Sequence, residues 1–314
     1  MGGYVTRRLA GIIPVWIAIA IVVFSLLRFI PGDPALVLLG AEATPEQLEA
    51  VRVQLGLTKP VPLQFADWMS HVVRGDLGNS LSSRRPVIVE IAERLPRSLE
   101  LAGFATTISL IISLPSGVIA AVRRNSIWDQ GFLSIGLFAV CIPSFVLGLL
   151  FILVFSVGLG WFPMRGYRPI SDGVLTWLKY LLLPALAYGL VDAAQLARMT
   201  RSTMIDVMSL DFIRTARSKG LRESRVIYRH ALRNALIPVV TIAGLNFGGL
   251  LANTVVMEYV FGLPGVGSLL IESIRNRDYP VVQGVMLIVA TIYTLLNLAV
   301  DLGYAYLDPR IRIE

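Results

Sequence analysis

The chain carries little charge for its length, and this shortage limits its class first. Only 16% of its 314 residues are charged and 55% are hydrophobic, whereas average soluble domains carry about 25% charged residues. The mean hydropathy of +0.70 points the same way. Most side chains are therefore predicted to lie away from water, which excludes an ordinary soluble domain.

Cysteine and histidine are nearly absent. Cys141 is the only cysteine, which excludes an intrachain disulfide, and its apolar neighbours predict a small buried side chain. His71 and His230 are the only histidines, and there is no His-Glu-x-x-His motif. A membrane enzyme is therefore a weak alternative: a serine–histidine hydrolase stays open on residue types, but no residues organise one.

The sequence also lacks the Gly-x-x-x-x-Gly-Lys-Ser/Thr loop that binds nucleotide phosphates. The net charge is +7, a balance that is also typical of nucleic-acid binding. Here, however, the basic residues lie between apolar runs, and this placement favours membrane orientation over a nucleic-acid partner.

Six apolar runs dominate the sequence. They cover residues 9–27, 101–122, 131–164, 180–197, 234–257 and 279–300, and Asp192 is the only charged residue within them. Runs of roughly 18 or more apolar residues are candidate membrane spans, and in lipid they must be helical to pair their backbone groups. The predicted fold is an all-α membrane protein with six transmembrane helices; the third run is longer than one span needs.

The basic residues predict the orientation of these helices. Arginines cluster in the short segments that face the cytoplasm if both termini do, and such clustering is typical of cytoplasmic loops. These segments contain Arg7, Arg8, Arg123, Arg124, the basic residues from Arg198 to Arg233, Arg310 and Arg312. The predicted division is an N-terminal end with the first helix (1–30), an extracytoplasmic cap segment (31–97), a five-helix core (98–306) and a cytoplasmic tail (307–314).

The most informative segment is the predicted cytoplasmic loop at residues 206–233. A helix is predicted from Ser209 or Asp211 to Lys219, with Gly220 in the left-handed position after it and a second helix from about Glu223. An ordinary basic loop is the alternative, but connections in helical bundles are usually only about 2–8 residues long.

One face of the first loop helix has a spacing that suggests a contact surface. Phe212, Ala216 and Gly220 are four residues apart and are predicted to share a face. Because alanine and glycine are small, this face would allow another protein to approach closely.

The loop resembles the ATPase-coupling motif of ABC importer permeases, in the dipeptide, oligopeptide, glutathione and nickel branch. Residues 212–220 follow Tyr/Phe-x-Arg-Thr-Ala-x-x-Lys-Gly, and residues 230–238 follow His-x-Leu-Arg-Asn-x-x-Ile-Pro. Arg214 replaces the acidic residue of the general motif, and Arg233 replaces its final proline. The coupling residues implied by the resemblance are Phe212, Arg214, Thr215, Ala216, Lys219, Gly220, Leu221, His230 and Arg233.

The resemblance extends over most of the chain. It includes Pro31-Gly32-Asp33-Pro34, Leu55-Gly56-Leu57, Gly75-Asp76-Leu77-Gly78, Ile142-Pro143-Ser144-Phe145, Leu183-Pro184-Ala185 and Leu307-Asp308-Pro309-Arg310. The stretch from Ser83 to Val87 resembles glutathione-type permeases in particular.

This resemblance implies a MetI-like permease core with an extracytoplasmic insertion after the first helix. It implies a non-catalytic subunit in the bacterial inner (plasma) membrane that passes a dipeptide, oligopeptide or glutathione-like substrate. The implied partners are a second homologous permease, two ABC ATPases, an extracytoplasmic substrate-binding protein and the lipid bilayer, with no nucleic acid. The chain is expected to bind no cofactor, since ATP and Mg²⁺ are used by the ATPases.

Two other transport functions stay open. A nickel-chelate permease belongs to the same branch. A secondary transporter is more distant, because such proteins often show paired broken helices in two halves, and that pattern is not found here.

Polar residues inside the apolar runs are the candidates for lining a translocation pathway. A carboxylate such as Asp192 costs about 2.5–3.5 kcal/mol at the bilayer centre, so it should face protein or water. A structural pairing, for instance with Arg198, is the favoured interpretation, and contact with a peptide ammonium group is the alternative. Asn246, Asn253 and Asn297 are further candidates, with interhelical hydrogen bonding as their alternative role.

The segment from Glu258 to Pro280 is too short and too rich in glycine and proline to span the membrane. The resemblance places it on the outer side near a gate, which makes Glu258 and Phe261 further candidates. Ser268 is expected to cap a helix over 269–275. In the cap segment, Thr44 is expected to cap a helix that begins at Pro45, and residues 75–78 are expected to form a turn.

Overall fold

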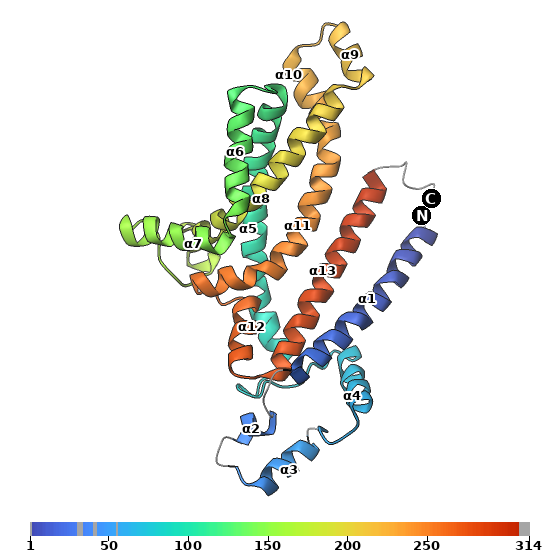
Figure 1. Cartoon of the computed structure of the whole chain (residues 1–314), viewed down its shortest axis with the longest axis vertical. Coiled ribbons are helices and arrows are strands. Elements are labelled where there is room, and N and C mark those ends of the chain that lie inside the picture. The colour runs from blue at the N-terminus through green and yellow to red at the C-terminus, as the bar shows by residue number, and fades with distance from the viewer. Residues whose placement is uncertain (1, 30–33, 40–42, 55, 308–314) are drawn as a thin grey trace. The chain divides into compact units, whose positions relative to one another are not determined.

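The structure, a computed structural model, describes residues 2–29, 34–39, 43–54 and 56–307, which form helices joined by turns and loops, with no β-strand among them (Figure 1). The α-helices are α1 (Gly2–Phe29), α2 (Pro34–Leu39), α3 (Pro45–Gln54), α4 (Val61–Val73), α5 (Val87–Val122), α6 (Ile127–Cys141), α7 (Ser144–Phe151), α8 (Val174–Met208), α9 (Asp211–Ser218), α10 (Glu223–Arg225), α11 (Leu232–Phe261), α12 (Val266–Arg275) and α13 (Tyr279–Leu307). Two π-helical segments, Ile152–Gly158 and Val226–Ala231, continue α7 and α10, and a 3-10 turn covers Ile170–Asp172. The predicted all-α fold is confirmed.

The six predicted spans correspond to four long apolar helices, one bent pair of helices and one shorter apolar helix. Among the described residues, four helices are long and apolar enough to cross a bilayer: α5, α8, the continuous helix Glu223–Phe261, and Tyr279–Gly303 in α13. Helix α6 and the segment Ser144–Gly158 meet the same test only as a pair, which is bent by 96°. The apolar part of α1, Ala10–Ser25, is shorter.

The bend explains why the third apolar run is longer than one span needs. Helix α6 ends at Cys141, and Ile142 is extended, with φ −95° and ψ 121°. Pro143 then precedes α7. Proline has no N–H and pushes the residue before it out of the helical region, so one straight helix cannot continue here. Figure 1 shows α7 leaving the end of α6 sideways.

Cys141 lies at this bend, and its expected burial is wrong. The side chain is exposed in the single chain. An apolar run places a residue in the membrane or the core, but it does not decide which face of the helix is covered. Hydrophobicity alone therefore could not separate these two outcomes.

The chain forms two compact units, each with its own apolar clusters. The first contains residues 1–98 and 264–295, and the second contains residues 99–263 and 296–314. The four segments predicted from the sequence are defined by a membrane and stay predictions. The turn predicted at Pro31–Pro34 and the tail 308–314 lie mostly or wholly outside the described residues.

In the first unit, local capping follows the sequence. Thr44 and Gln47 cap α3 reciprocally: the Gln47 N–H donates to Thr44 Oγ1 at 3.4 Å, and the Thr44 N–H donates to Gln47 Oε1 at 3.0 Å. Gly75 and Gly78 have φ of +81° and +78° in the predicted turn. Both predictions are confirmed.

The start of α12 shows a capping partner that the sequence did not reveal. The helix begins at Val266 rather than 269, and Ser268 lies inside its first turn with its hydroxyl donating to the Gly265 carbonyl at 2.9 Å. The Val266 N–H donates to Ser98 Oγ on α5 at 2.8 Å. The cap therefore comes from a residue far away in the sequence, and the prediction for Ser268 is wrong.

In the second unit, α8 packs against α6, α7 and α11, and it also contacts α5. The approach to α5 is close because glycines stand at the crossings. A Cβ built on Gly189 would lie 2.7 Å from the Ala105 carbonyl oxygen, and one on Gly117 would lie 2.7 Å from the Ala197 carbonyl oxygen. Apolar residues of α5 and α8 around the Gly189 crossing, including Leu101, Ile108, Leu181 and Leu183, are buried in one cluster.

We predict that Gly117→Ala destabilises the second unit. The new methyl group would overlap the backbone of α8, and such overpacking costs about 1–3 kcal/mol. Thermal unfolding of the purified protein in detergent is expected to show a lower Tm. Gly103→Ala on the same helix is the control, because no atom lies within 4 Å of its Cβ position; equal Tm values for the two variants would contradict the prediction.

Candidate coupling loop and polar stripe

The loop between α8 and α11 forms two short helical pieces around a tight turn at Gly220, at one end of the second unit (Figure 1). Gly220 has φ of +70°, the left-handed conformation that the sequence predicted. Its N–H donates to the Arg217 carbonyl at 2.9 Å, and the Leu221 N–H reaches the Ala216 carbonyl at 3.4 Å. These two bonds form a Schellman motif, which ends α9 at a defined point.

The inner face of α9 is formed by Ile213 and Ala216. Ile213 is 0% exposed and Ala216 is 7% exposed, and both pack in a cluster with Met204, Val226 and Ala231. Phe212 points elsewhere and is 42% exposed. The predicted common face of Phe212, Ala216 and Gly220 is therefore wrong, because Ala216 covers the chain's own core. A second protein could reach Phe212 and the Gly220 turn, but it could not reach Ala216, which is buried in the cluster of this chain.

A side-chain pair braces the same turn from outside. The Arg217 guanidinium donates to both carboxylate oxygens of Glu223, at 2.6 and 3.2 Å. The hydrogen bond and the charge of Glu223 raise the pKa of Arg217 above its ordinary value, so the guanidinium stays charged. Both groups are about half exposed, so the pair contributes little stability but limits the orientations of the turn.

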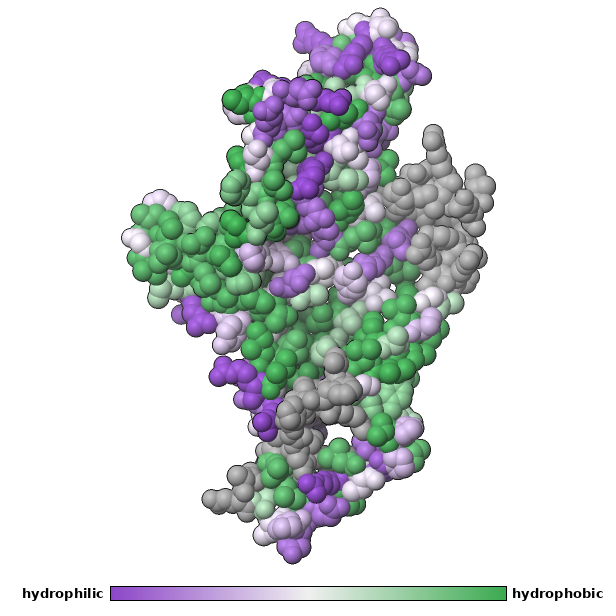
Figure 2. Space-filling view, viewed as in Figure 1, coloured by the Kyte–Doolittle hydropathy of each residue, from purple (hydrophilic) through white to green (hydrophobic). Residues whose placement is uncertain are grey.

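The other predicted coupling residues lie mostly on the surface. Arg214, Thr215, Lys219 and Arg233 are exposed, whereas Leu221 and His230 are partly buried. Arg214 pairs with Asp211 at 3.4 Å. Lys219 and Arg233 make no ion pair with the described residues, and Figure 2 shows this end of the unit as mainly hydrophilic. The loop therefore presents a basic surface around a fixed turn.

Asp192 lies inside α8 and joins three helices. Its carboxylate accepts a hydrogen bond from Ser109 Oγ on α5 at 2.7 Å and one from Asn246 Nδ2 on α11 at 2.6 Å. The suggested partner Arg198 is exposed and makes no ion pair with it in the described part of the chain. The suggested pairing with Arg198 is therefore wrong, and the partners of Asp192 are neutral.

A second polar contact repeats this pattern along the same two helices. The Asn253 side chain on α11 lies near the Tyr188 hydroxyl on α8. Tyr188 and Asp192 are four residues apart, and Asn246 and Asn253 are seven apart, so each pair lies on one helix face. We call Tyr188, Asp192, Asn246 and Asn253 the polar stripe. Its spacing was visible in the sequence, but Tyr188 and Ser109 were missed because single polar residues are common in helices.

The remaining pathway candidates do not join this stripe. Glu258 is 1% exposed and Phe261 is 3% exposed, so both are buried near the end of α11. The last carbonyls of α11 are held by the preceding loop: the Arg165 guanidinium donates to the Tyr259 carbonyl at 2.7 Å, and the Gly166 N–H donates to the Phe261 carbonyl at 2.8 Å. The Asn297 side chain on α13 has a buried Oδ1 without a hydrogen-bond partner.

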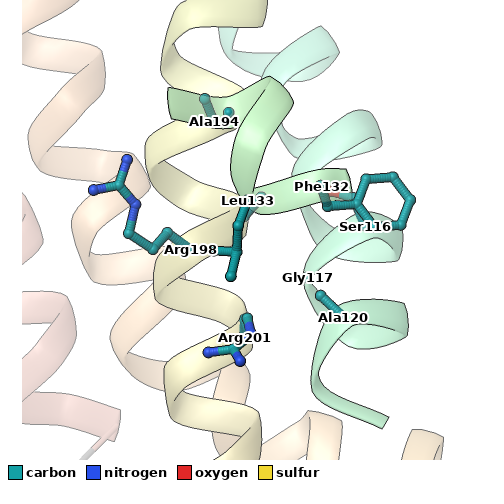
Figure 3. A pocket seen from close by; sticks show the side chains of 10 residues that line it. Ser116, Gly117, Ala120, Phe132, Leu133, Ala194, Arg198 and Arg201 are labelled. Atoms are coloured by element: carbon teal, nitrogen blue, oxygen red, sulfur yellow. The ribbon is translucent and has the colours of Figure 1, made fainter. Parts of the chain in front are cut away.

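A small cleft between α5, α6 and α8 is the pocket shown in Figure 3. Its volume is about 20 Å³, which is room for about one water molecule. It is lined by Ser116, Gly117, Ala120, Phe132, Leu133, Gly136, Ala194, Ala197, Arg198 and Arg201. Near it, Arg201 binds the buried Asp129 of α6 through two hydrogen bonds, at 2.5 and 2.8 Å. The cleft results from small residues at helix contacts and is far too small for a peptide.

Comparison with known proteins connects these features to one family. Residues 113–313 match the family described as "Binding-protein-dependent transport system inner membrane component", and residues 1–102 match the N-terminal region of such membrane components. A Brucella abortus (strain 2308) protein with the name of a peptide transport system permease protein is 45% identical over 314 residues, with all of both chains covered. The glutathione transport system permease protein GsiC of Escherichia coli (strain K12) is 44% identical over the same length, also with full coverage.

The fold is also found in a solved structure. The chain is similar to an inward-facing form of the MetNI methionine ABC transporter, with a TM-score of 0.58 and 18% identity. The match covers 70% of this chain and 96% of that chain. At this identity the likeness shows the fold alone, and it confirms the predicted MetI-like core.

We predict that Ala216→Glu lowers the stability of the isolated chain while Phe212→Glu does not. The glutamate at 216 would put an unpaired carboxylate into the cluster around Met204, at a cost of at least about 2 kcal/mol. The glutamate at 212 would lie at the surface of the same helix. Thermal unfolding in detergent checks this, and a Phe212→Glu variant with the lower Tm would show that the assignment of faces is reversed.

Proposed function

The chain belongs to the family of binding-protein-dependent transport system inner membrane components, and from this premise we propose that it forms part of the channel through which an ATP-driven importer moves peptides. The protein is a multi-pass membrane permease subunit of an ABC importer and not an enzyme. The observation that carries a coupling role is the Gly220 turn, which holds an exposed basic helix end in one conformation.

The substrate class follows from the full-length relatives. Their names assign peptides to the Brucella abortus protein and glutathione to the Escherichia coli protein. Both kinds of substrate are small molecules with an amino group, carboxylates and peptide-type bonds. We therefore infer a dipeptide, oligopeptide or glutathione-like substrate, and no observation favours the nickel-chelate alternative.

A permease of this family works with ATPase and substrate-binding partners. In the finer proposal, the chain pairs with a second homologous permease, and the two permeases work with two ABC ATPases and one extracytoplasmic binding protein. ATP and Mg²⁺ are then bound by the ATPases, and this chain holds no cofactor.

The coupling mechanism is proposed to act through α9 and the turn after it. The exposed residues Phe212, Lys219 and Gly220 would contact an ATPase subunit, while Ile213 and Ala216 would fasten α9 to the core of the permease. A push on the turn would then reach α8 and α11 directly, because both helices continue into this cluster. The exposed ion pair of Arg217 and Glu223 would keep the turn in one conformation when the ATPase subunit presses on it.

We predict that Gly220→Val weakens ATPase association or uncouples ATP hydrolysis from uptake. A Cβ in the left-handed region costs about 1–2 kcal/mol, and the open surroundings of Gly220 contain no atom that would clash with it. The effect would thus come from the backbone of the turn. ATPase copurification, ligand-stimulated hydrolysis and peptide uptake in the assembled complex are the measurements.

Two further variants define the control for this experiment. Gly220→Asn is expected to keep most of the coupling, because asparagine tolerates the left-handed region. Gly75→Val adds a comparable backbone cost at φ +81°, also with open surroundings, but in the predicted extracytoplasmic segment. If Gly220→Val retains normal association and uptake, or if Gly75→Val impairs ATPase association equally, the loop is not the coupling element.

The proposed orientation places both termini in the cytoplasm and the segment after α1 outside. We predict that a cysteine at Pro60, in a Cys141→Ser background, is labelled by an impermeant maleimide added to intact spheroplasts. Pro60 is exposed, and Cys141 must be replaced because it is exposed as well. Labelling only after the membrane is opened would reverse the assigned orientation.

A further inference from the structure

Asp192 places a carboxylate close to the midpoint of α8. It lies 18 residues after the start of a 35-residue helix, or about 27 Å along a helix of roughly 52 Å at 1.5 Å per residue. Its two partners, Ser109 and Asn246, are neutral donors. Neutral hydrogen bonds hold the carboxylate in position but leave its negative charge uncompensated.

Another acid of this unit, the buried Asp129, has a different set of partners. Asp129 is 2% exposed, and its charge is neutralised by two hydrogen bonds from Arg201. It also accepts the Asn125 N–H at 2.9 Å. In this ion pair the charge of the carboxylate is balanced within the chain, so no ligand is needed to balance it. Asp192 lacks such a cation in the described part of the chain, although Arg198 lies only six residues further along α8.

The surroundings of Asp192 are polar or small and are open in the single chain. Gln195, three residues after Asp192, is exposed, and so is Asn253 on α11. Gly249, between Asn246 and Asn253, has no atom within 4 Å of its Cβ position. Figure 2 shows hydrophilic patches interrupting the hydrophobic face over α8 and α11. A face with amides and a carboxylate is costly against lipid, so it is suited to a water-filled path.

We infer that Asp192 binds a primary ammonium group of the passing substrate, with Ser109 and Asn246 holding the carboxylate toward the path. The N-terminus of a peptide and the side chain of a lysine residue both supply such a group. The ammonium would provide the missing positive charge, and a charge-assisted hydrogen bond to a fixed carboxylate is strong in a low-dielectric site. This inference rests on the proposed function, because it assigns a role within peptide transport.

Replacement of Asp192 by asparagine separates this role from a structural one. Asparagine has nearly the same shape, its oxygen can accept from Asn246, and its amide can donate to the Ser109 hydroxyl, which also accepts. Asp192→Asn therefore keeps both contacts and removes only the charge. Ser109→Ala does the opposite, since it removes one contact and keeps the charge.

The test uses the complete importer in proteoliposomes, with the binding protein saturated by either lysylalanine or diacetyl-lysylalanine, in which both amino groups are acetylated and no ammonium group remains. For each dipeptide, uptake is divided by the amount of ATP hydrolysed, and the value for lysylalanine is then divided by the value for diacetyl-lysylalanine. We expect this ratio to fall about tenfold in Asp192→Asn and by a smaller factor in Ser109→Ala, which keeps the charge and loses only one of the two bonds that hold the carboxylate. An unchanged ratio in Asp192→Asn, or the same change in both variants, would overturn the inference.

A second measurement needs no variant and covers the case in which Asp192→Asn fails to assemble. Wild-type complex is treated with a carbodiimide, and modification of Asp192 is followed by peptide mass spectrometry with and without lysylalanine-loaded binding protein during turnover. Slower modification with lysylalanine, and none of this protection with diacetyl-lysylalanine, is the expected result. Equal modification under all conditions would refute the site. Absence of any dipeptide uptake by the wild-type complex would instead refute the proposed function.

Discussion

Inside a bilayer a polar group is costly unless it finds a partner, and several polar contacts between the helices of the second unit meet on α8. Asp192 connects α8 to α5 and α11, and Arg201 connects it to α6 through Asp129. Gly117 and Gly189 let α5 approach the backbone of α8 closely. Because these contacts all meet on one helix, a displacement of α8 changes the position of its neighbours as well.

The coupling loop extends this arrangement beyond the membrane. Helix α9 follows α8 after a short turn, and its buried face packs with the ends of both α8 and the helix that leads into α11. The Schellman motif at Gly220 and the pair of Arg217 and Glu223 fix the two pieces of the loop to each other. The loop is thus a rigid extension of two spans, and under the proposed coupling role a change at Gly220 would act at a distance from any substrate.

The features that the sequence predicted correctly are determined by neighbouring residues. The left-handed Gly220, the cap at Thr44, and the turn at Gly75 and Gly78 follow from the conformations that these residues favour on their own. The apolar runs likewise predicted the helices, since lipid leaves the backbone no other way to pair.

The features that were missed depend on residues far apart in the sequence. The cap of α12 comes from Ser98, 168 positions away, and the partners of Asp192 lie 83 and 54 positions away. The burial of Ala216 depended on which side of α9 the core occupies, and neither alanine nor its spacing contains that information. Coupling and pathway roles for these residues are accordingly proposals built on packing that only the three-dimensional structure supplies.

The contact between Asp192 and its two partners also has a consequence for the order of assembly during synthesis. Ser109 has already been made when α8 leaves the ribosome, so half of the hydrogen bonding is available at once. Asn246 follows 54 residues later, which takes roughly 3–11 s at about 5–20 residues per second. For that interval α8 holds a half-paired carboxylate in the membrane. The arrival of α11 completes the pairing, and the nascent chain therefore gains its three-helix contact in a single late step.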